Sequence, residues 1–271
     1  MNWFFLLSDT DSAFHVGTDL EVGTMLVSER LKKNIGKAVV ITCSVFGAAT
    51  ANLGWAEQSC FPTIDSKEPQ YIVAVGSLMQ TAARNKKLNK SEIEFPVWVR
   101  GYERGWFGRN FNRPPQRTML AVRAEPGKKF NGLLLHSTSG VISSIDRGDL
   151  ITCREKIDPR KLQSMTSEKL PDRGQFWIYT VKKPNNRKAA SKFPIQQSEV
   201  DIFLTGCIEQ AKQFNLPEFA NQCVKSTYAW SEHWNNDRER PVAKLVTAKR
   251  PQVDKLLEQL EGGLFDRIRE D

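Results

Sequence analysis

The sequence contains no low-complexity tract, and its lysines and arginines nowhere form a dense basic block with aromatic residues between them. The first absence excludes a chain without a packed core, because 271 residues with 40% hydrophobic content suffice for one or two globular domains. The second absence argues against a nucleic-acid partner, although the formal net charge is +8. We expect a positive field that suits small acidic ligands.

The residue patterns of metal sites and of serine hydrolases are also missing. His136 and His233 have no cysteine or carboxylate partner at ligand spacing, so the sequence predicts no metal centre. Ser77 is not enclosed in a Gly-x-Ser-x-Gly elbow, and no histidine is placed by the sequence as its base. An acyl-enzyme mechanism is therefore not expected.

An apolar run without charge, Ala38–Leu53, follows a basic stretch that begins at Met25. This order is typical of a signal peptide, and small residues offer cleavage after Ala51 or Ala56. We expect residues 1–56 to be an extension plus signal peptide, with Met25 as the true start. Sixteen uncharged residues are short for a membrane span, so no stable anchor is expected after cleavage. The protein is then periplasmic or secreted; if the run is instead a buried core helix, the protein is cytoplasmic.

Four cysteines lie beyond residue 56, namely Cys60, Cys153, Cys207 and Cys223. In an oxidising compartment they can form two disulfides with three connectivities, whereas in the cytosol they are expected to be small buried hydrophobic residues. Two predicted helices flank a turn at Asn215–Pro217. If the helices are antiparallel, Cys207 and Cys223 lie level with one another, so we expect that bridge and Cys60–Cys153 as the remaining pair.

Strand patterns dominate the first part of the remaining chain. Tyr71–Val75 is a short apolar run that ends at Gly76, which predicts a buried strand and a tight loop whose successive N–H groups suit an anion. Thr81–Phe95 is polar and is expected to be an excursion over the surface. Further strands are predicted over Pro96–Arg109, on both sides of a turn at Glu125–Gly127, and over Gln175–Lys183.

Helical patterns follow. A short helix or turn is expected within Ser139–Ile157, and from Ser198 the hydrophobic period becomes 3.6. A serine cap at Ser198 begins one helix, a second helix begins at Pro217, and a last one covers Pro251–Gly263. We expect a linker over residues 57–69, one α+β domain over 70–245, and a helical C-terminal tail over 246–271.

Several short motifs occur in a fixed order. They are a Gly-Ser-Leu loop, a Gly-aromatic-x-Arg stretch, a Pro-Gly turn before a Gly-Leu-Leu strand, a segment with an acidic residue at its fifth position, and a Trp-x-x-Asp-Arg-x-x-Pro tail. In this chain they are Gly76-Ser77-Leu78, Gly101–Arg104, Pro126-Gly127 with Gly132-Leu133-Leu134, Ile145–Ile157, and Trp234, Asp237, Arg238 and Pro241. In this order they resemble the gamma-glutamylcyclotransferase-like family.

The resemblance implies a small mixed β-barrel flanked by helices. It also implies an activity, in which a γ-glutamyl amide or peptide is cyclised to 5-oxoproline with release of an amine, without a metal or an organic cofactor. A carboxylate acts as general acid and base, and matches Asp149. The loop expected to bind the small-molecule substrate matches Val75, Gly76, Ser77 and Leu78.

Three positions depart from the family pattern. Val75 replaces an aromatic residue, Asp149 replaces the glutamate, and Thr152 replaces a tyrosine. Aspartate is one methylene shorter, and a displacement of about 1 Å at a catalytic base costs on the order of a hundredfold in rate. Two functions therefore stay open: a gamma-glutamylcyclotransferase that uses Asp149, and an inactive homologue that binds a γ-glutamyl or other small acidic ligand. A plain turn cap after Gly148 is the structural alternative for Asp149.

Overall fold

The structure is a computed structural model that describes residues 60–88, 93–112, 114–244 and 249–269. The expected signal peptide, the start at Met25 and both cleavage sites lie outside the described residues. None of the helices within the described ranges is long and apolar enough to cross a bilayer.

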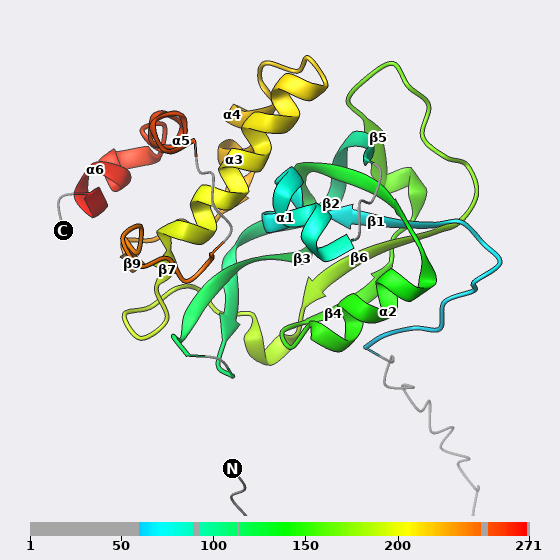
Figure 1. Ribbon diagram of the computed structural model, residues 1–271, viewed down its shortest axis with the longest axis horizontal. Coiled ribbons are helices and arrows are strands. Elements are labelled where there is room, and N and C mark those ends of the chain that lie inside the picture. The colour runs from blue at the N-terminus through cyan, green and yellow to red at the C-terminus, as the bar shows by residue number, and fades with distance from the viewer. Residues whose placement is uncertain (1–59, 89–92, 113, 245–248, 270–271) are drawn as a thin grey trace, which may run out of the picture. The chain divides into compact units, whose positions relative to one another are not determined.

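A mixed sheet of nine strands forms the centre of the domain, as the expected α+β class requires (Figure 1). Its main path runs β4-β6-β1-β3-β2-β5, and β1 is antiparallel to β3 but parallel to β6. In the part of the chain that the structure describes, no pairing joins the end strands β4 and β5, so hydrogen bonds do not close the expected barrel. The strands are β1 Gln70–Ala74, β2 Ile93–Asn110, β3 Arg117–Ser137, β4 Thr152–Lys156, β5 Leu162–Ser164, β6 Gln175–Val181, β7 Ile195–Gln196, β8 Thr227–Tyr228 and β9 Trp234–Asn235.

The expected turn at Glu125–Gly127 is wrong, because β3 passes through these residues as one strand. Its partner β2 pairs with it on both sides: Arg100 faces Lys129, and Tyr102 faces Ala124. Residues 125–128 therefore bulge opposite a single glycine, Gly101, whose φ is +77°. The local turn preference is overridden by the ladder that continues beyond the bulge.

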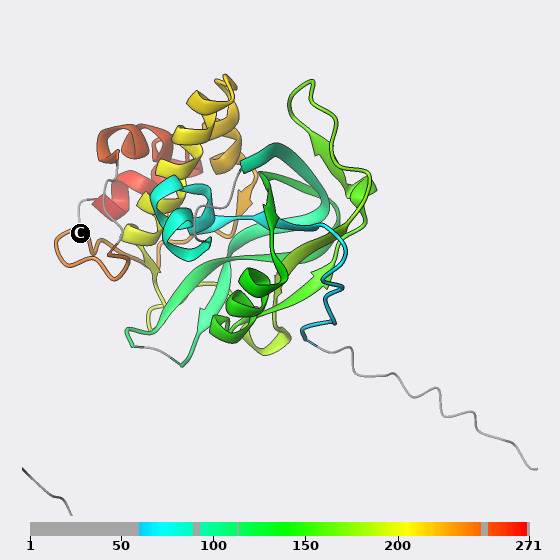
Figure 2. The ribbon, with the colours of Figure 1, turned by 45° about the vertical axis from the view of Figure 1, so that its right-hand side comes forward.

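The helices gather mainly on one side of the sheet, where α3, α4 and α5 lie together, whereas α2 lies apart from them (Figures 1 and 2). The segment expected as a surface excursion instead forms α1, which buries Ala83, Arg84 and Leu88. The sequence did not predict this helix, because most of its residues are polar and only a narrow face is buried. The helices are α1 Thr81–Leu88, α2 Ser139–Gly148, α3 Gln197–Gln213, α4 Phe219–Lys225, α5 Arg250–Leu257 and α6 Leu264–Arg269, with a 3₁₀ turn, η1, at Gly76–Met79.

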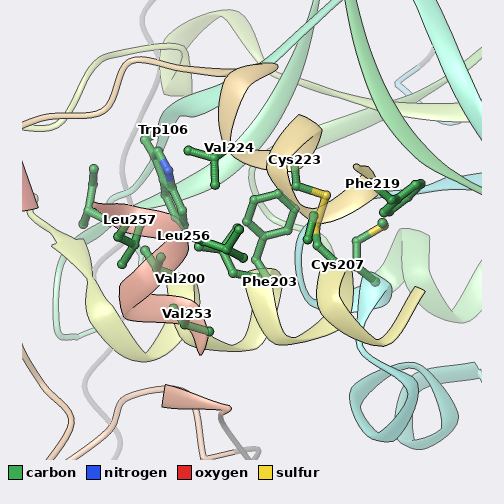
Figure 3. Packing of buried hydrophobic residues seen from close by; sticks show 14 of the residues in the cluster. Trp106, Val200, Phe203, Cys207, Phe219, Cys223, Val224, Val253, Leu256 and Leu257 are labelled. Carbon is green, nitrogen blue, oxygen red and sulfur yellow. A yellow bond between two sulfur atoms is a disulfide. The ribbon is translucent and has the colours of Figure 1, made fainter. Parts of the chain in front are cut away.

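The largest apolar core lies between these helices and the sheet. Figure 3 shows Phe203 of α3 packed between the α4 disulfide and Leu256 of α5, with Trp106 of β2 nearby. The 3.6-residue period predicts an apolar face with Val200, Phe203, Leu204 and Cys207, and these four residues are buried. Residues on the other sides of α3 are buried as well, so most of the helix is enclosed rather than one face alone. Full burial of each large apolar side chain contributes about 1.5–3 kcal/mol, so this cluster fixes the position of α3 on the sheet.

The N-terminus of α3 is capped by Asp237, which lies 39 residues after Ser198 in the sequence. Ser198 was expected to cap the helix, but its amide and its hydroxyl instead donate to the carboxylate of Asp237, at 2.7 and 2.6 Å. The neighbouring Arg238 pairs with Asp201 of α3 and with Asp254 of α5. The Trp-x-x-Asp-Arg motif thus joins two helices.

Both predicted disulfides are present. Cys207 of α3 is bonded to Cys223 of α4, and Cys60 is bonded to Cys153 of β4 (Figure 3 shows the first). The second bond is accompanied by Arg154, whose amide donates to the carbonyl of Cys60 at 2.9 Å and whose guanidinium donates to that of Pro62 at 2.7 Å. The described part of the expected linker is therefore fastened to the sheet.

Candidate functional site

The loop after β1 forms one wall of a pocket. Gly76 has a φ of +57°, in the left-handed region that glycine adopts without strain, and it begins η1. The amide of Leu78 donates to the carbonyl of Val75 at 3.2 Å. This amide is committed within the loop, so a cradle of successive free N–H groups through Leu78 is not formed.

Helices α1 and α3 hold this loop in place. The buried guanidinium of Arg84 donates to the carbonyls of Leu78 and Met79 at 2.9 and 3.1 Å, and Gln210 donates to Met79 at 2.9 Å. Gly206 of α3 lies against the loop backbone, because a Cβ atom there would come closer than 3.0 Å to Gln80 and Met79. The loop and α3 therefore behave as one packed unit.

The pocket has a volume of about 610 Å³ and lies between η1, β3, the α2–β4 turn and α3. The predicted loop residues Val75, Gly76, Ser77 and Leu78 all line it, and so does Asp149. The structure thus brings together two segments that are more than 70 residues apart in the sequence. A pocket of this size suits a small organic ligand.

Asp149 follows the last turn of α2. Its Oδ1 accepts the amides of Ile151 and Thr152 at 3.0 and 2.9 Å, and its Oδ2 accepts the hydroxyl of Thr152. Both oxygens are thus engaged by the turn into β4. Asp149 lines the pocket, and its carboxylate caps the turn into β4.

Tyr179 of β6 lines the pocket beside Asp149. Its hydroxyl donates to Asp146 at 2.7 Å, and Asp146 also pairs with Arg154 at 3.0 Å. Burial raises the pKa of Tyr179, and Asp146 adds to the shift, so the phenol stays protonated at neutral pH. Asp146, the second residue of the Ile145–Ile157 segment, is therefore held by the hydroxyl of Tyr179 and the guanidinium of Arg154.

Three charged pocket residues were not identified from the sequence. Glu199, in the first turn of α3, pairs with Arg117 of β3 at 2.7 Å, and its side chain is only 15% exposed. Lys87 of α1 donates to the Ser77 hydroxyl at 2.8 Å. No local pattern marks these residues, because the sequence separates them by 30 positions or more.

The charges in the pocket shift one another's ionisation. Burial raises the pKa of Glu199, and Arg117 opposes the shift. Desolvation lowers the pKa of Lys87, although much of that residue is open to solvent, and Glu199 and Asp149 oppose this shift. Two carboxylates and two cations thus face one pocket. Such an arrangement can bind a ligand that carries both charges and can exchange protons with it.

No group of three or more histidine, cysteine or acidic residues gathers as a metal site anywhere in the described ranges. No family model and no curated protein matches the chain. Among solved structures, a gamma-glutamyl cyclotransferase is similar at 12% identity and a TM-score of 0.45, over 75% of this chain and 100% of that one.

Two further structures are similar at the same level. An uncharacterized protein from Homo sapiens has 12% identity and a TM-score of 0.42, over 64% of this chain and 96% of that one. A yeast gamma-glutamyl cyclotransferase described as specific to glutathione has 9% identity and a TM-score of 0.37, over 59% and 98%. These neighbours include the family that the motifs resemble. At these values the likeness assigns neither an activity nor a residue role to this chain.

Proposed function

We propose that the pocket binds a γ-glutamyl amide or peptide and cyclises it to 5-oxoproline with release of an amine. The observation that carries this proposal is the common pocket of the Val75–Leu78 loop and Asp149. The order of the motifs predicted that the loop and Asp149 belong to one site. The pocket also has two cations that can bind the carboxylate of a substrate and carboxylates that can bind its amine.

The reaction needs a base and a bent substrate. The α-ammonium of the γ-glutamyl group must lose a proton before its nitrogen can attack the γ-carbonyl carbon, and Asp149 is the proposed base. Holding the nitrogen near that carbon supplies a large part of the rate acceleration. Lys87 and Arg117 provide positive charge for the α-carboxylate of the substrate.

The second candidate is a binding protein without turnover. It is favoured by the hydrogen bonds to Asp149, whose two oxygens already accept from Ile151 and Thr152. A carboxylate held in this way, and one methylene shorter than glutamate, is poorly placed to reach a substrate nitrogen. The charged pocket would then recognise a γ-glutamyl or other small acidic ligand.

Release of 5-oxoproline from a panel of γ-glutamyl peptides and γ-glutamyl alkylamines tests the two candidates. We expect turnover by the wild type and a loss of at least about a hundredfold in Asp149→Asn, because the amide cannot take a proton. Asn keeps an oxygen for the two backbone amides, so the fold should persist. The exposed Asp172→Asn is the matched control and should retain full activity.

Asp149→Glu separates an enzyme from a binding protein. The longer carboxylate should raise turnover if reach limits the rate. If neither wild type nor Asp149→Glu releases 5-oxoproline, yet a γ-glutamyl compound raises the melting temperature, the protein is a binder. If no compound is turned over and none stabilises the fold, both candidates are rejected.

We also propose that the protein works outside the cytoplasm, in the periplasm or after secretion. Two disulfides among the described residues support this location, because such bonds persist in oxidising compartments. Substrates would then be γ-glutamyl compounds that reach the protein from outside the cytosol.

A further inference from the structure

Glu199 is a largely enclosed acid, with 15% of its side chain exposed, that lines the pocket and has no part in the proton transfers proposed above. Resting on that proposed function, we propose that Glu199 is the general acid that protonates the leaving nitrogen, while Asp149 receives the protons of the attacking nitrogen. The family resemblance assigned no role to this position. In this proposal Asp149 is the general base and Glu199 is the general acid.

The hydrogen bonds of Glu199 leave it available for this work. Its Oε1 accepts from Nε of Arg117 at 2.7 Å, which fixes the side chain against β3. Its Oε2 has no hydrogen-bond partner among the residues that the structure describes, and Glu199 lines the pocket. Asp149, by contrast, has both oxygens engaged by the turn. Glu199, in the first turn of α3, therefore has an oxygen free to contact a ligand in the pocket.

The groups that face Glu199 come from three elements. Arg117 approaches from β3, Lys87 from α1, and Asp237 from the segment after β9. Desolvation raises the pKa of Glu199, Asp237 adds to the shift, and the two cations oppose it. An acid in such surroundings keeps its proton to a higher pH than a solvated glutamate, which is what donation to a leaving amine requires.

The proton balance needs two proton-transfer groups or one group used repeatedly. The α-ammonium loses two protons as the C–N bond of the lactam forms, and Asp149 passes both to solvent. The C–N bond to the leaving group breaks as Glu199 donates its proton to that nitrogen. The released amine gains a second proton from solvent, and solvent restores the proton of Glu199, so atoms and charge balance.

The test compares two leaving groups. An alkylamine needs a proton in order to leave, whereas a p-nitroanilide leaves with little help from an acid. We expect Glu199→Gln to lower kcat for a γ-glutamyl alkylamine by at least about a hundredfold, and to leave kcat for γ-glutamyl p-nitroanilide within about threefold. Gln still offers an oxygen to Arg117. The exposed Glu258→Gln is the matched control and should change neither rate.

The pH profile gives a second measurement. Wild-type kcat for the alkylamine should fall as pH rises through the pKa of Glu199, because the acid loses its proton. Glu199→Gln should lack this alkaline limb, and Glu199→Asp should retain it at a lower rate. The Asp variant also serves if Glu199→Gln fails to fold.

The outcomes are distinct. Equal losses on both substrates, or unchanged turnover of the alkylamine, would overturn the role of Glu199 while the proposed cyclisation stands. If the wild type turns over neither substrate nor any other γ-glutamyl compound, the proposed function fails, and the role of Glu199 fails with it.

Discussion

Arg104 is a charged side chain enclosed entirely by protein, with no carboxylate beside it in the described structure. Its guanidinium donates to Thr227, Ser226 and the carbonyl of Cys223 at 2.9–3.0 Å, and to Asn131. It also lies over the rings of Phe130 and Phe203. Burial lowers the pKa of Arg104 to about 9, so it remains charged at neutral pH. The arginine of the Gly-aromatic-x-Arg motif therefore has a structural role, because its hydrogen bonds connect β2 to α4.

We expect Arg104→Met to destabilise the protein by about 3 kcal/mol or more, because several buried acceptors lose their donor at once. Chemical denaturation measures this loss. Arg100→Met, on the same strand but exposed, is the matched control and should cost less than about 1 kcal/mol. Equal stability of the two variants would contradict the structural role.

At the scale of elements, the position of the η1 loop depends on its contact with α3. We expect Gly206→Ala to cost about 1–3 kcal/mol, because the added Cβ would overlap the backbone of Met79 and Gln80. It should also weaken ligand binding, since Ser77 lies in the displaced loop. Thermal unfolding and ligand-induced stabilisation measure the two effects.

Gly140 offers the control for this substitution. It lies in α2, where a Cβ atom would meet only the Thr138 hydroxyl at 3.9 Å. Gly140→Ala should therefore stabilise the protein by about 0.5–1 kcal/mol through helix propensity. A Gly206→Ala protein as stable as the wild type would show that α3 and η1 do not constrain one another.

Elements with strong local periodicity were predictable. The 3.6-residue pattern predicted that α3 is a helix with a buried apolar face, although other sides of α3 are buried too. The apolar run at Tyr71–Val75 predicted β1, because each pattern reflects burial of neighbouring residues. Helix α1 was not predicted, because its buried face consists of Ala83, Arg84 and Leu88 and so lacks a repeating apolar pattern. The Asp237 cap and the Glu199–Arg117 pair were missed because 39 and 82 positions separate the partners. Contacts of that kind are decided by packing rather than by local pattern.

At the scale of the whole molecule, one disulfide joins the segment before β1 to β4, and the other joins α3 to α4. We expect non-reducing peptide mapping of the protein from its host to find Cys60–Cys153 and Cys207–Cys223 fully formed. Reduction should lower stability by about 3 kcal/mol for the shorter loop and somewhat more for the longer one. Free thiols in the native protein would argue against a location outside the cytoplasm.

The distant cap of α3 also has a consequence for the order in which the protein is completed during synthesis. Asp237 is added to the chain 39 residues after Ser198, and Val242 and Ala243, which line the pocket, come later still. The sheet and the η1 loop can assemble on a nascent chain before these residues exist. The first turn of α3, which carries Glu199, obtains its hydrogen-bond acceptor only afterwards. A chain that stalls before residue 237 would therefore hold most of its core but an unfinished pocket.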